Sequence, residues 1–132
     1  MAFLVKYSNE DVKRFSSLRE IPNPQDVHYI DCSKCCLSFF EEGSTGLTNE
    51  DMEELKNFNN LKYLDCSYNN ITELNLPSTL TTLYCNSNFG INLNELPQNL
   101  EKLSCMNCGL KSLPKLPSTV VVNCKYNYIT EN

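Results

Sequence analysis

The chain has 132 residues, and its 16 Asp and Glu outnumber its 11 Lys and Arg, which gives a net charge of −5. This length fits a single domain, and 41% hydrophobic residues is typical of a folded chain. The acidic balance argues against a protein that binds chiefly to nucleic acid or to an anionic membrane. No apolar run approaches the ~20 residues that cross a bilayer. The first five residues lack the basic start of a secretory signal. We therefore expect a cytoplasmic protein.

Residues 1–26 are expected to form an N-terminal cap and a linker. Ser8 is a suitable N-cap, and Val12, Phe15 and Leu18 recur at helical spacing. This pattern predicts a helix over residues 9–19. Its expected role is to cover the apolar end of the repeats that follow, because an open end turn exposes its core.

Residues 27–132 contain five copies of one short pattern. A fixed period near 20 residues indicates a solenoid, in which each turn buries its apolar face on the next. Two sets of residues keep this period. Cys66, Cys85, Cys105 and Cys124 follow one another at intervals of 19, 20 and 19, with Cys32 placed 34 residues before Cys66, and Pro77, Pro97 and Pro117 are 20 apart.

The copies align residue by residue. They read Val27-x-x-Ile30-x-Cys32-x-x-Cys35-x-Leu37, Leu61-x-x-Leu64-x-Cys66-x-x-Asn69-x-Ile71, Leu80-x-x-Leu83-x-Cys85-x-x-Asn88, Leu100-x-x-Leu103-x-Cys105-x-x-Cys108-x-Leu110 and Val122-x-Cys124-x-x-Asn127-x-Ile129. This resembles the leucine-rich repeat L-x-x-L-x-L-x-x-N/C-x-L, with cysteine at the third leucine. Tails such as Leu76-Pro77-Ser78-Thr79 are similar to those of the short bacterial repeats in the YopM and IpaH effectors.

The resemblance implies an α+β solenoid. Its expected form is a right-handed coil with a short parallel β-sheet on the concave face, an N-terminal capping helix and one convex helix. For an effector or a viral protein, the compartment would be the cytoplasm of a host. Similar repeats mostly serve recognition, and the resemblance carries over no catalytic residue.

Alternation along each strand divides inward from outward positions. In the second copy Leu64 and Cys66 are expected to point inward, and Tyr63, Asp65 and Ser67 outward. In the bend after the strand, the side-chain amides of Asn69, Asn88 and Asn127 are expected to bond backbone groups that the turn leaves unpaired. Cys35 and Cys108 take that position in two copies, where a thiol bonds only weakly.

A helical insertion interrupts the repeats at about residues 38–60. Thr48 is a suitable N-cap with Asp51 three residues later, and Met52, Leu55 and Phe58 form an apolar stripe. These features predict a helix over residues 49–58 on the convex side.

The cysteines raise the question of metal or disulfide bonding. Cys32-x-x-Cys35 and Cys105-x-x-Cys108 have the spacing of a zinc site, but they lie three strands apart, about 14 Å by strand spacing. We therefore expect no metal and no cofactor. The five cysteines that keep the repeat period, Cys32, Cys66, Cys85, Cys105 and Cys124, are called the ladder cysteines, and they are expected to be buried, reduced thiols. For Cys36, outside the ladder, an exposed modifiable thiol and an ordinary surface cysteine remain alternatives.

Catalytic patterns are weak in this sequence. A thiol hydrolase needs a histidine base, and His28, the one histidine, is expected on the rim while Cys32 points inward. There is no phosphate-binding glycine motif, and the ubiquitin-ligase domain that follows IpaH-like repeats has no room. We expect no enzyme and no catalytic residues.

The outward strand positions form the candidate binding site. Tyrosines on three adjoining strands are expected to form one amphipathic patch, and tyrosine supplies a large contact area with few rotatable bonds. The alternative is that tyrosine is there for its strand propensity. Tyr68 and Tyr126 flank the same surface at the strand ends. The predicted partner-binding residues are Tyr29, Asp31, Tyr63, Asp65, Tyr84, Asn86, Lys102, Met106, Asn123 and Lys125.

Two functions remain open. In the first, the chain is a non-enzymatic adaptor or inhibitor that binds a protein partner through the tyrosine-rich concave face. In the second, it is a structural subunit, for example of a viral or multiprotein particle, or a homodimer. That subunit would dock through the uncapped C-terminal repeat at Val122, Cys124 and Ile129.

Overall fold

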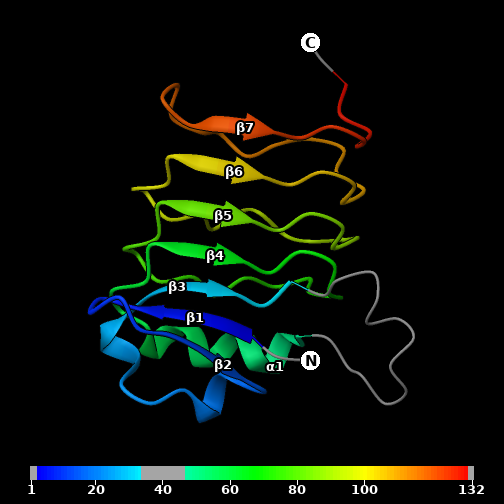
Figure 1. Cartoon of the computed structure of the whole chain (residues 1–132). Coiled ribbons are helices and arrows are strands. Elements are labelled where there is room, and N and C mark those ends of the chain that lie inside the picture. Colours follow the sequence, from blue (N-terminus) through cyan, green and yellow to red (C-terminus); the bar gives the residue numbers. More distant parts are fainter. Residues whose placement is uncertain (1–2, 34–46, 131–132) are drawn as a thin grey trace.

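The structure is a computed structural model and describes residues 3–33 and 47–130. These residues form a seven-stranded sheet with strand order β2-β1-β3-β4-β5-β6-β7, with a helical segment beside it (Figure 1). The strands are β1 (Phe3–Tyr7), β2 (Val12–Phe15), β3 (Val27–Asp31), β4 (Tyr63–Asp65), β5 (Thr82–Tyr84), β6 (Lys102–Ser104) and β7 (Val121–Asn123). The helical elements are η1 (Leu18–Glu20), η2 (Pro24–Asp26), α1 (Asn49–Met52) and η4 (Glu53–Asn57).

Strands β3 to β7 lie parallel and in chain order along a coil (Figure 1). Residues at equivalent positions of successive repeats are paired with one another. This register is strongly favoured, because a shift by one residue would turn the apolar side chains of a strand away from the core. Pairing in register places one residue of each strand in a single row, which consists of Ile30, Leu64, Leu83, Leu103 and Val122. The predicted solenoid with a short parallel sheet is confirmed.

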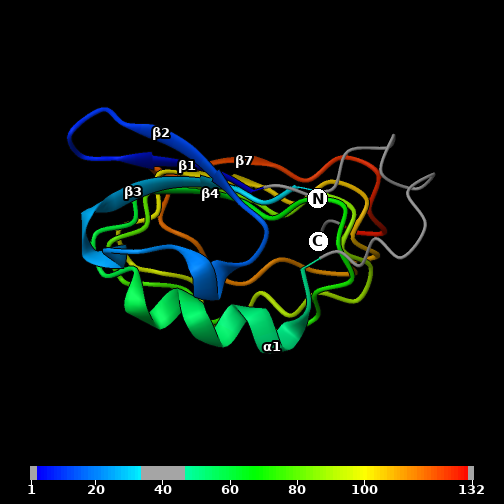
Figure 2. The ribbon, with the colours of Figure 1, turned by 60° about the horizontal axis from the view of Figure 1, so that its bottom comes forward.

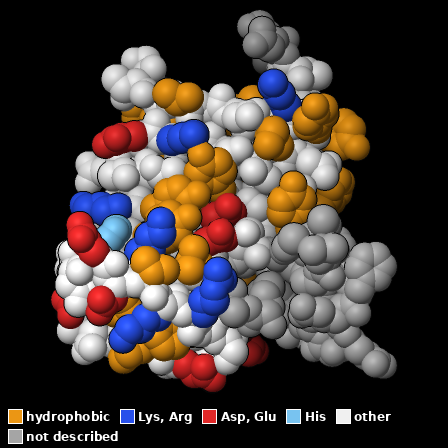
Figure 3. Space-filling view, viewed as in Figure 1, with side chains coloured by type: hydrophobic (Ala, Val, Ile, Leu, Met, Phe, Trp, Pro, Cys, Tyr) orange, Lys and Arg blue, Asp and Glu red, His pale blue; other side chains and the backbone are white. Residues whose placement is uncertain are grey.

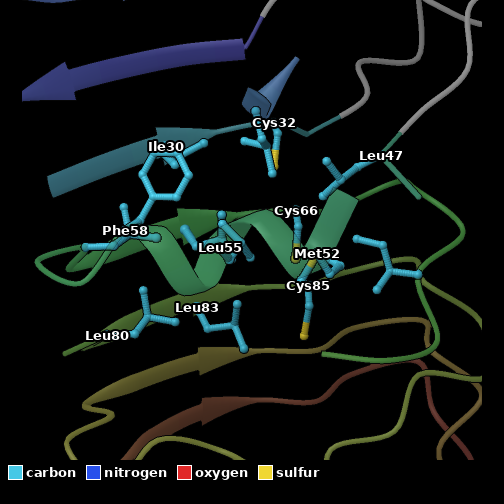
Figure 4. Packing of buried hydrophobic residues seen from close by; sticks show 14 of the residues in the cluster. Ile30, Cys32, Leu47, Met52, Leu55, Phe58, Cys66, Leu80, Leu83 and Cys85 are labelled. Carbon is cyan, nitrogen blue, oxygen red and sulfur yellow. The ribbon is translucent and has the colours of Figure 1, made fainter. Parts of the chain in front are cut away.

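The inside of the coil is filled by leucine, isoleucine and cysteine side chains (Figure 4). Cys32, Cys66, Cys85 and Cys105 are at most 1% exposed, as predicted, whereas Cys124 on the last turn is half-buried. The thiols of Cys66 and Cys85 each donate to a backbone carbonyl of the next strand, over 3.5 Å. A cysteine at this position therefore packs as a small apolar side chain and also bonds to the neighbouring turn.

The predicted asparagine bonds are present in three turns. Asn88, fully buried, donates from Nδ2 to the carbonyls of Cys66, Cys85 and Asn86, and its Oδ1 accepts from the amide of Ile71. Equivalent bonds are made by Asn69 and Asn127. At the corresponding place in the fourth turn, the Cys108 thiol donates to two carbonyls, over 3.2 and 3.4 Å.

The predicted helix of the insertion is confirmed at residues 49–57, although only its first part is α-helical. Thr48 and Asp51 form a reciprocal capping box at its start. Met52, Leu55 and Phe58 are at most 1% exposed and face the core (Figure 4). The helix lies on the side of the coil opposite the sheet (Figure 2).

The prediction of an N-terminal capping helix at residues 9–19 is wrong. Strand β2 pairs antiparallel with β1, and β1 pairs antiparallel with β3, so a β-hairpin extends the sheet at this end. Val12 is 55% exposed and does not contribute to the core. The hairpin is favoured because Phe3, Val5 and Tyr7 alternate inward along β1 and because its backbone satisfies the open edge of β3.

At the other end, the last turn is only partly covered. Val121 is 65% exposed, and Val122 and Cys124 are half-buried. In the described part of the chain, no helix has the length and apolar character needed to cross a bilayer. Cys35, Cys36, Leu37 and the insertion residues up to 46 lie outside the described residues.

Candidate functional site

Three tyrosines, one from each of β3, β4 and β5, form a column across the outer face of the sheet (Figure 3). Tyr29 and Tyr63 are paired in register, with ring centroids 4.2 Å apart and ring planes 10° apart. Tyr84 is diagonal to Tyr63, with centroids 5.6 Å apart and planes at 41°. We call these three residues the tyrosine column. Each such pair contributes about 0.5–1.5 kcal/mol beyond its burial, which favours one fixed arrangement of the rings.

A lysine lies over the ring at each end of the column. The Nζ of Lys6, on β1, is 4.2 Å from the centroid of Tyr29, and the Nζ of Lys102, on β6, is 5.1 Å from that of Tyr84. Both distances are within the range of cation–π attraction. Because the ring faces are covered by neighbours, a ligand at this surface meets mainly the ring edges and the phenol hydroxyls.

Burial changes the acidity of the column. It raises the pKa of Tyr29 and, more strongly, that of Tyr63. The charges of Tyr29 and Asp65 raise the pKa of Tyr63 further. Both phenols are therefore neutral at physiological pH, and each hydroxyl can donate as well as accept a hydrogen bond.

Two aspartates lie beside the column on the same face. Asp31 and Asp65 are paired in register on β3 and β4. The Oδ1 of each accepts a 3.0 Å bond from the amide of Ser33 or Ser67, which holds both carboxylates in place. Burial raises the pKa of Asp65, against the lowering effect of its bonds to Ser67, and the charge of Asp31 raises it further. The face thus carries two carboxylates and two lysines.

The remaining predicted residues are placed less favourably. Asn86 is only 8% exposed, and its Oδ1 accepts from the Oγ of Ser104 and the amide of Met106, so this oxygen cannot bind a partner. Asn123 and Lys125 belong to the last turn, and β7 lies two strands beyond β5. The structure therefore does not place Asn123 and Lys125 next to the tyrosine column.

The strand ends carry a second row of residues, at the position two after each ladder cysteine. The four residues of this row that the structure describes have a left-handed backbone: Tyr68 (φ 61°), Ser87 (φ 57°), Asn107 (φ 56°) and Tyr126 (φ 63°). Asparagine tolerates this conformation, whereas for a bulky side chain it is strained. Tyr68 and Tyr126 are nevertheless 51% and 77% exposed, so no core packing compensates for that strain.

The buried cysteines are poor nucleophiles and poor metal ligands. Burial raises the pKa of the thiols of Cys32, Cys66 and Cys85 well above the ordinary value, and that of Cys105 to about 12. Both kinds of chemistry require the thiolate, which these thiols do not supply at neutral pH. Among the residues that the structure describes, no three His, Cys, Asp or Glu side chains gather as metal ligands do.

Lys6 is the residue of this face that sequence reasoning missed. It lies on a strand where a linker was expected, and pairing of β1 with β3 places it opposite Tyr29. The alternation of apolar residues at Phe3, Val5 and Tyr7 is the signal that could have placed Lys6 on the outer face.

Comparison of the chain with family models, with curated proteins and with solved structures finds no match. The similarity to leucine-rich repeats therefore depends on the sequence pattern. Functional inference depends on the chemistry of the sheet face described above.

Proposed function

We propose that this chain is a leucine-rich-repeat protein without enzymatic activity that binds a protein partner through the outer face of its sheet. The observation that carries the proposal is the tyrosine column with a lysine at each end. Three large aromatic side chains on one exposed sheet face exceed what the core requires, because the core is already filled from the opposite face.

The chemistry of this face suits protein recognition. Stacking holds the tyrosine rings in one arrangement before binding, so little side-chain entropy is lost when a partner docks. Phenol hydroxyls, two carboxylates and two ammonium groups lie within one patch, and such mixed groups select a partner by complementary charge. Unpaired thiols at the six described cysteines fit a reducing, cytoplasmic compartment.

The proposal is tested with a partner isolated from the native source and then purified. We expect Tyr63→Ala with Tyr84→Ala to weaken binding of that partner at least ~30-fold, because truncation of a central aromatic residue commonly costs about 2 kcal/mol or more and one such loss is already ~30-fold. Tyr128→Ala is the matched control, since Tyr128 is 66% exposed and lies outside the column. Titration calorimetry measures the affinities, and the melting temperature shows whether each variant is folded.

Two results would overturn the proposal. The first is a purified partner that binds the folded double variant as tightly as the unchanged chain. The second is a partner whose affinity falls equally for Tyr128→Ala, which would place the interface elsewhere.

A second candidate function is assembly through the last turn. The observation that favours it is the exposure of Val121, Tyr126 and Tyr128, at 65%, 77% and 66%. Apolar side chains gathered at one end of a stacked sheet favour association with another chain. If this is correct, Val121→Lys will shift the sedimentation coefficient at high concentration from that of an oligomer to that of a monomer. A monomer before the substitution would exclude self-assembly.

A further inference from the structure

A groove of about 460 Å³ lies at the carboxyl ends of the parallel strands, beside the tyrosine column. Its size is within the range of small-ligand and peptide sites. No Lys, Arg, Asp, Glu or His is among the residues that line it, which are Tyr68, Asn86, Ser87, Met106, Asn107 and Tyr126.

Two tyrosines flank this groove. Tyr68 follows β4 and Tyr126 follows β7, three strand spacings apart, or about 14 Å between backbones. Ser87 and Asn107 occupy the two places between them and are bonded to each other over 3.3 Å. Short side chains in the middle and tyrosines at the two ends leave a hollow with aromatic sides.

One of the residues that line the groove, Asn86, has a polar group without a partner in the described part of the chain. Asn86 is 8% exposed, and its Oδ1 is engaged by Ser104 and Met106. Its Nδ2 donates to no residue in the described part of the chain. A nearly buried N–H donor is costly to leave unpaired, so a ligand in this groove gains by presenting an oxygen acceptor to Nδ2.

We propose that this groove binds an uncharged, proline-rich segment of the protein partner in the polyproline II conformation. Such a segment presents proline rings that pack on aromatic side chains, and its carbonyls have no internal hydrogen bonds. Proline also has no backbone N–H, so the ligand brings acceptors without donors. That matches a groove whose nearly buried side chain offers a free donor.

Other ligand classes fit this groove less well. A charged peptide or a phosphate would find no counter-charge among the lining residues. An amphipathic helix needs an apolar floor along its length, whereas Ser87 and Asn107 are polar. A sugar brings hydroxyl donors as well as acceptors, and the Oδ1 of Asn86 is already engaged, so a neutral sugar serves as the competing probe in the test below.

The inference rests on the proposed function, because it takes the partner to be a protein. Its test uses a peptide probe and needs no partner. The probe is a decaproline peptide with both ends blocked, titrated into the whole chain and followed by NMR chemical shifts. We expect saturable shifts at residues 86–87 and 106–107. Tyr68→Asn and Tyr126→Asn are each expected to weaken binding about tenfold, as loss of an aromatic anchor does.

These substitutions separate a binding role from a structural one. Asparagine suits the left-handed backbone and is the natural residue at position 107 of the same row. The two variants should therefore melt at the same or a higher temperature while losing affinity. Tyr128→Asn, at an exposed tyrosine outside the groove, should leave the affinity unchanged.

A further variant tests the donor itself. Asn86→Asp keeps an Oδ1 acceptor for Ser104 and Met106 but removes the N–H, and it should weaken decaproline binding without new shifts elsewhere. The inference is overturned if decaproline does not bind, if the tyrosine variants bind as tightly as the unchanged chain, or if the neutral sugar chitotriose shifts the same resonances while decaproline does not. Loss of partner binding in Tyr63→Ala with Tyr84→Ala, with decaproline binding intact, would separate the two sites.

Discussion

Each turn of the coil leaves backbone groups that neither a strand nor a helix satisfies. In three turns one asparagine side chain satisfies these groups. In Asn88, Nδ2 donates to carbonyls of two successive turns, and Oδ1 accepts from an amide of the preceding turn. The fully buried side-chain amide of Asn88 thus provides hydrogen bonds to backbone groups that have no backbone partner. This explains why the position recurs with the repeat.

Removal of this side chain should therefore be costly. We expect Asn88→Ala to lower the free energy of unfolding by about 3 kcal/mol, because it leaves buried donors and acceptors unpaired. Asn127→Ala, at the half-buried last turn, should cost about 1 kcal/mol, because water can replace the lost bonds there. Urea unfolding with an unchanged m-value measures both. Equal losses at the two positions would contradict this explanation.

The ladder cysteines should make the free energy of unfolding fall at alkaline pH. Burial raises the pKa of Cys66 and Cys85 above the ordinary thiol value of 9.0, so above pH 9 the unfolded chain binds fewer protons than the native chain. Stability should therefore be full below pH 9 and fall as the pH rises, by up to about 1.4 kcal/mol per unit for each fully buried thiol. Urea unfolding at pH 8 and pH 10 measures the slope.

The control for this prediction is Cys85→Val, which keeps an apolar side chain and removes one titrating group. It should reduce the loss of stability between the two pH values. A free energy of unfolding that does not change from pH 8 to pH 10 would show that the thiols are not protected in the native state.

Among the elements, the N-terminal hairpin takes the place that a capping helix was expected to fill. Strand β1 covers the first turn of the coil: Val5 is fully buried and is paired with Ile30. Strand β2 is the outer edge, and its Lys13 and Arg14 are exposed. Charged side chains on an edge strand discourage pairing with other chains.

This arrangement predicts an unequal effect of two similar substitutions in the hairpin. Val5→Ala should destabilise the chain by about 2 kcal/mol, because it leaves a cavity against the first turn. Val12→Ala, at a side chain that is 55% exposed, should change stability by less than about 0.5 kcal/mol. Thermal unfolding compares the two variants directly. A greater loss of stability for Val12→Ala would contradict the hairpin and support the helix that the sequence pattern predicted.

The sequence predicts some of these elements well. The repeat register and the helix after Thr48 were predictable, because a period near 20 and a capping box are local signals. The hairpin was missed because Val12, Phe15 and Leu18 also fit a helical period, and pairing with β3 decided between the two. For the same reason the contact of Lys6 with Tyr29 was not foreseen. Burial of Asn86 depends on its bonds to the next strand, which spacing does not reveal.

At the scale of the whole molecule, the register of the repeats separates two kinds of side chain onto the two faces of the sheet. The ladder sulfurs line the inside of the coil, and the tyrosines with their lysines and aspartates lie on the outer face (Figure 3). Both proposed binding surfaces lie on this one sheet, the tyrosine column across strands β3 to β5 and the groove beyond the carboxyl ends of the strands. Because the strands are fixed by a continuous core, the sheet presents both surfaces in a constant relative position.

Hydroxyl-radical footprinting read residue by residue with mass spectrometry tests this division most directly, since sulfur and aromatic side chains both react readily when exposed. In the native chain, Cys66, Cys85 and Cys105 should be oxidised far more slowly than in urea. Tyr126 and Tyr128 should react at nearly the same rate in both conditions. The measurement is made at a concentration at which the chain sediments as a monomer. Oxidation of the ladder cysteines at their unfolded rate, or protection of these two tyrosines in the monomer, would contradict the account.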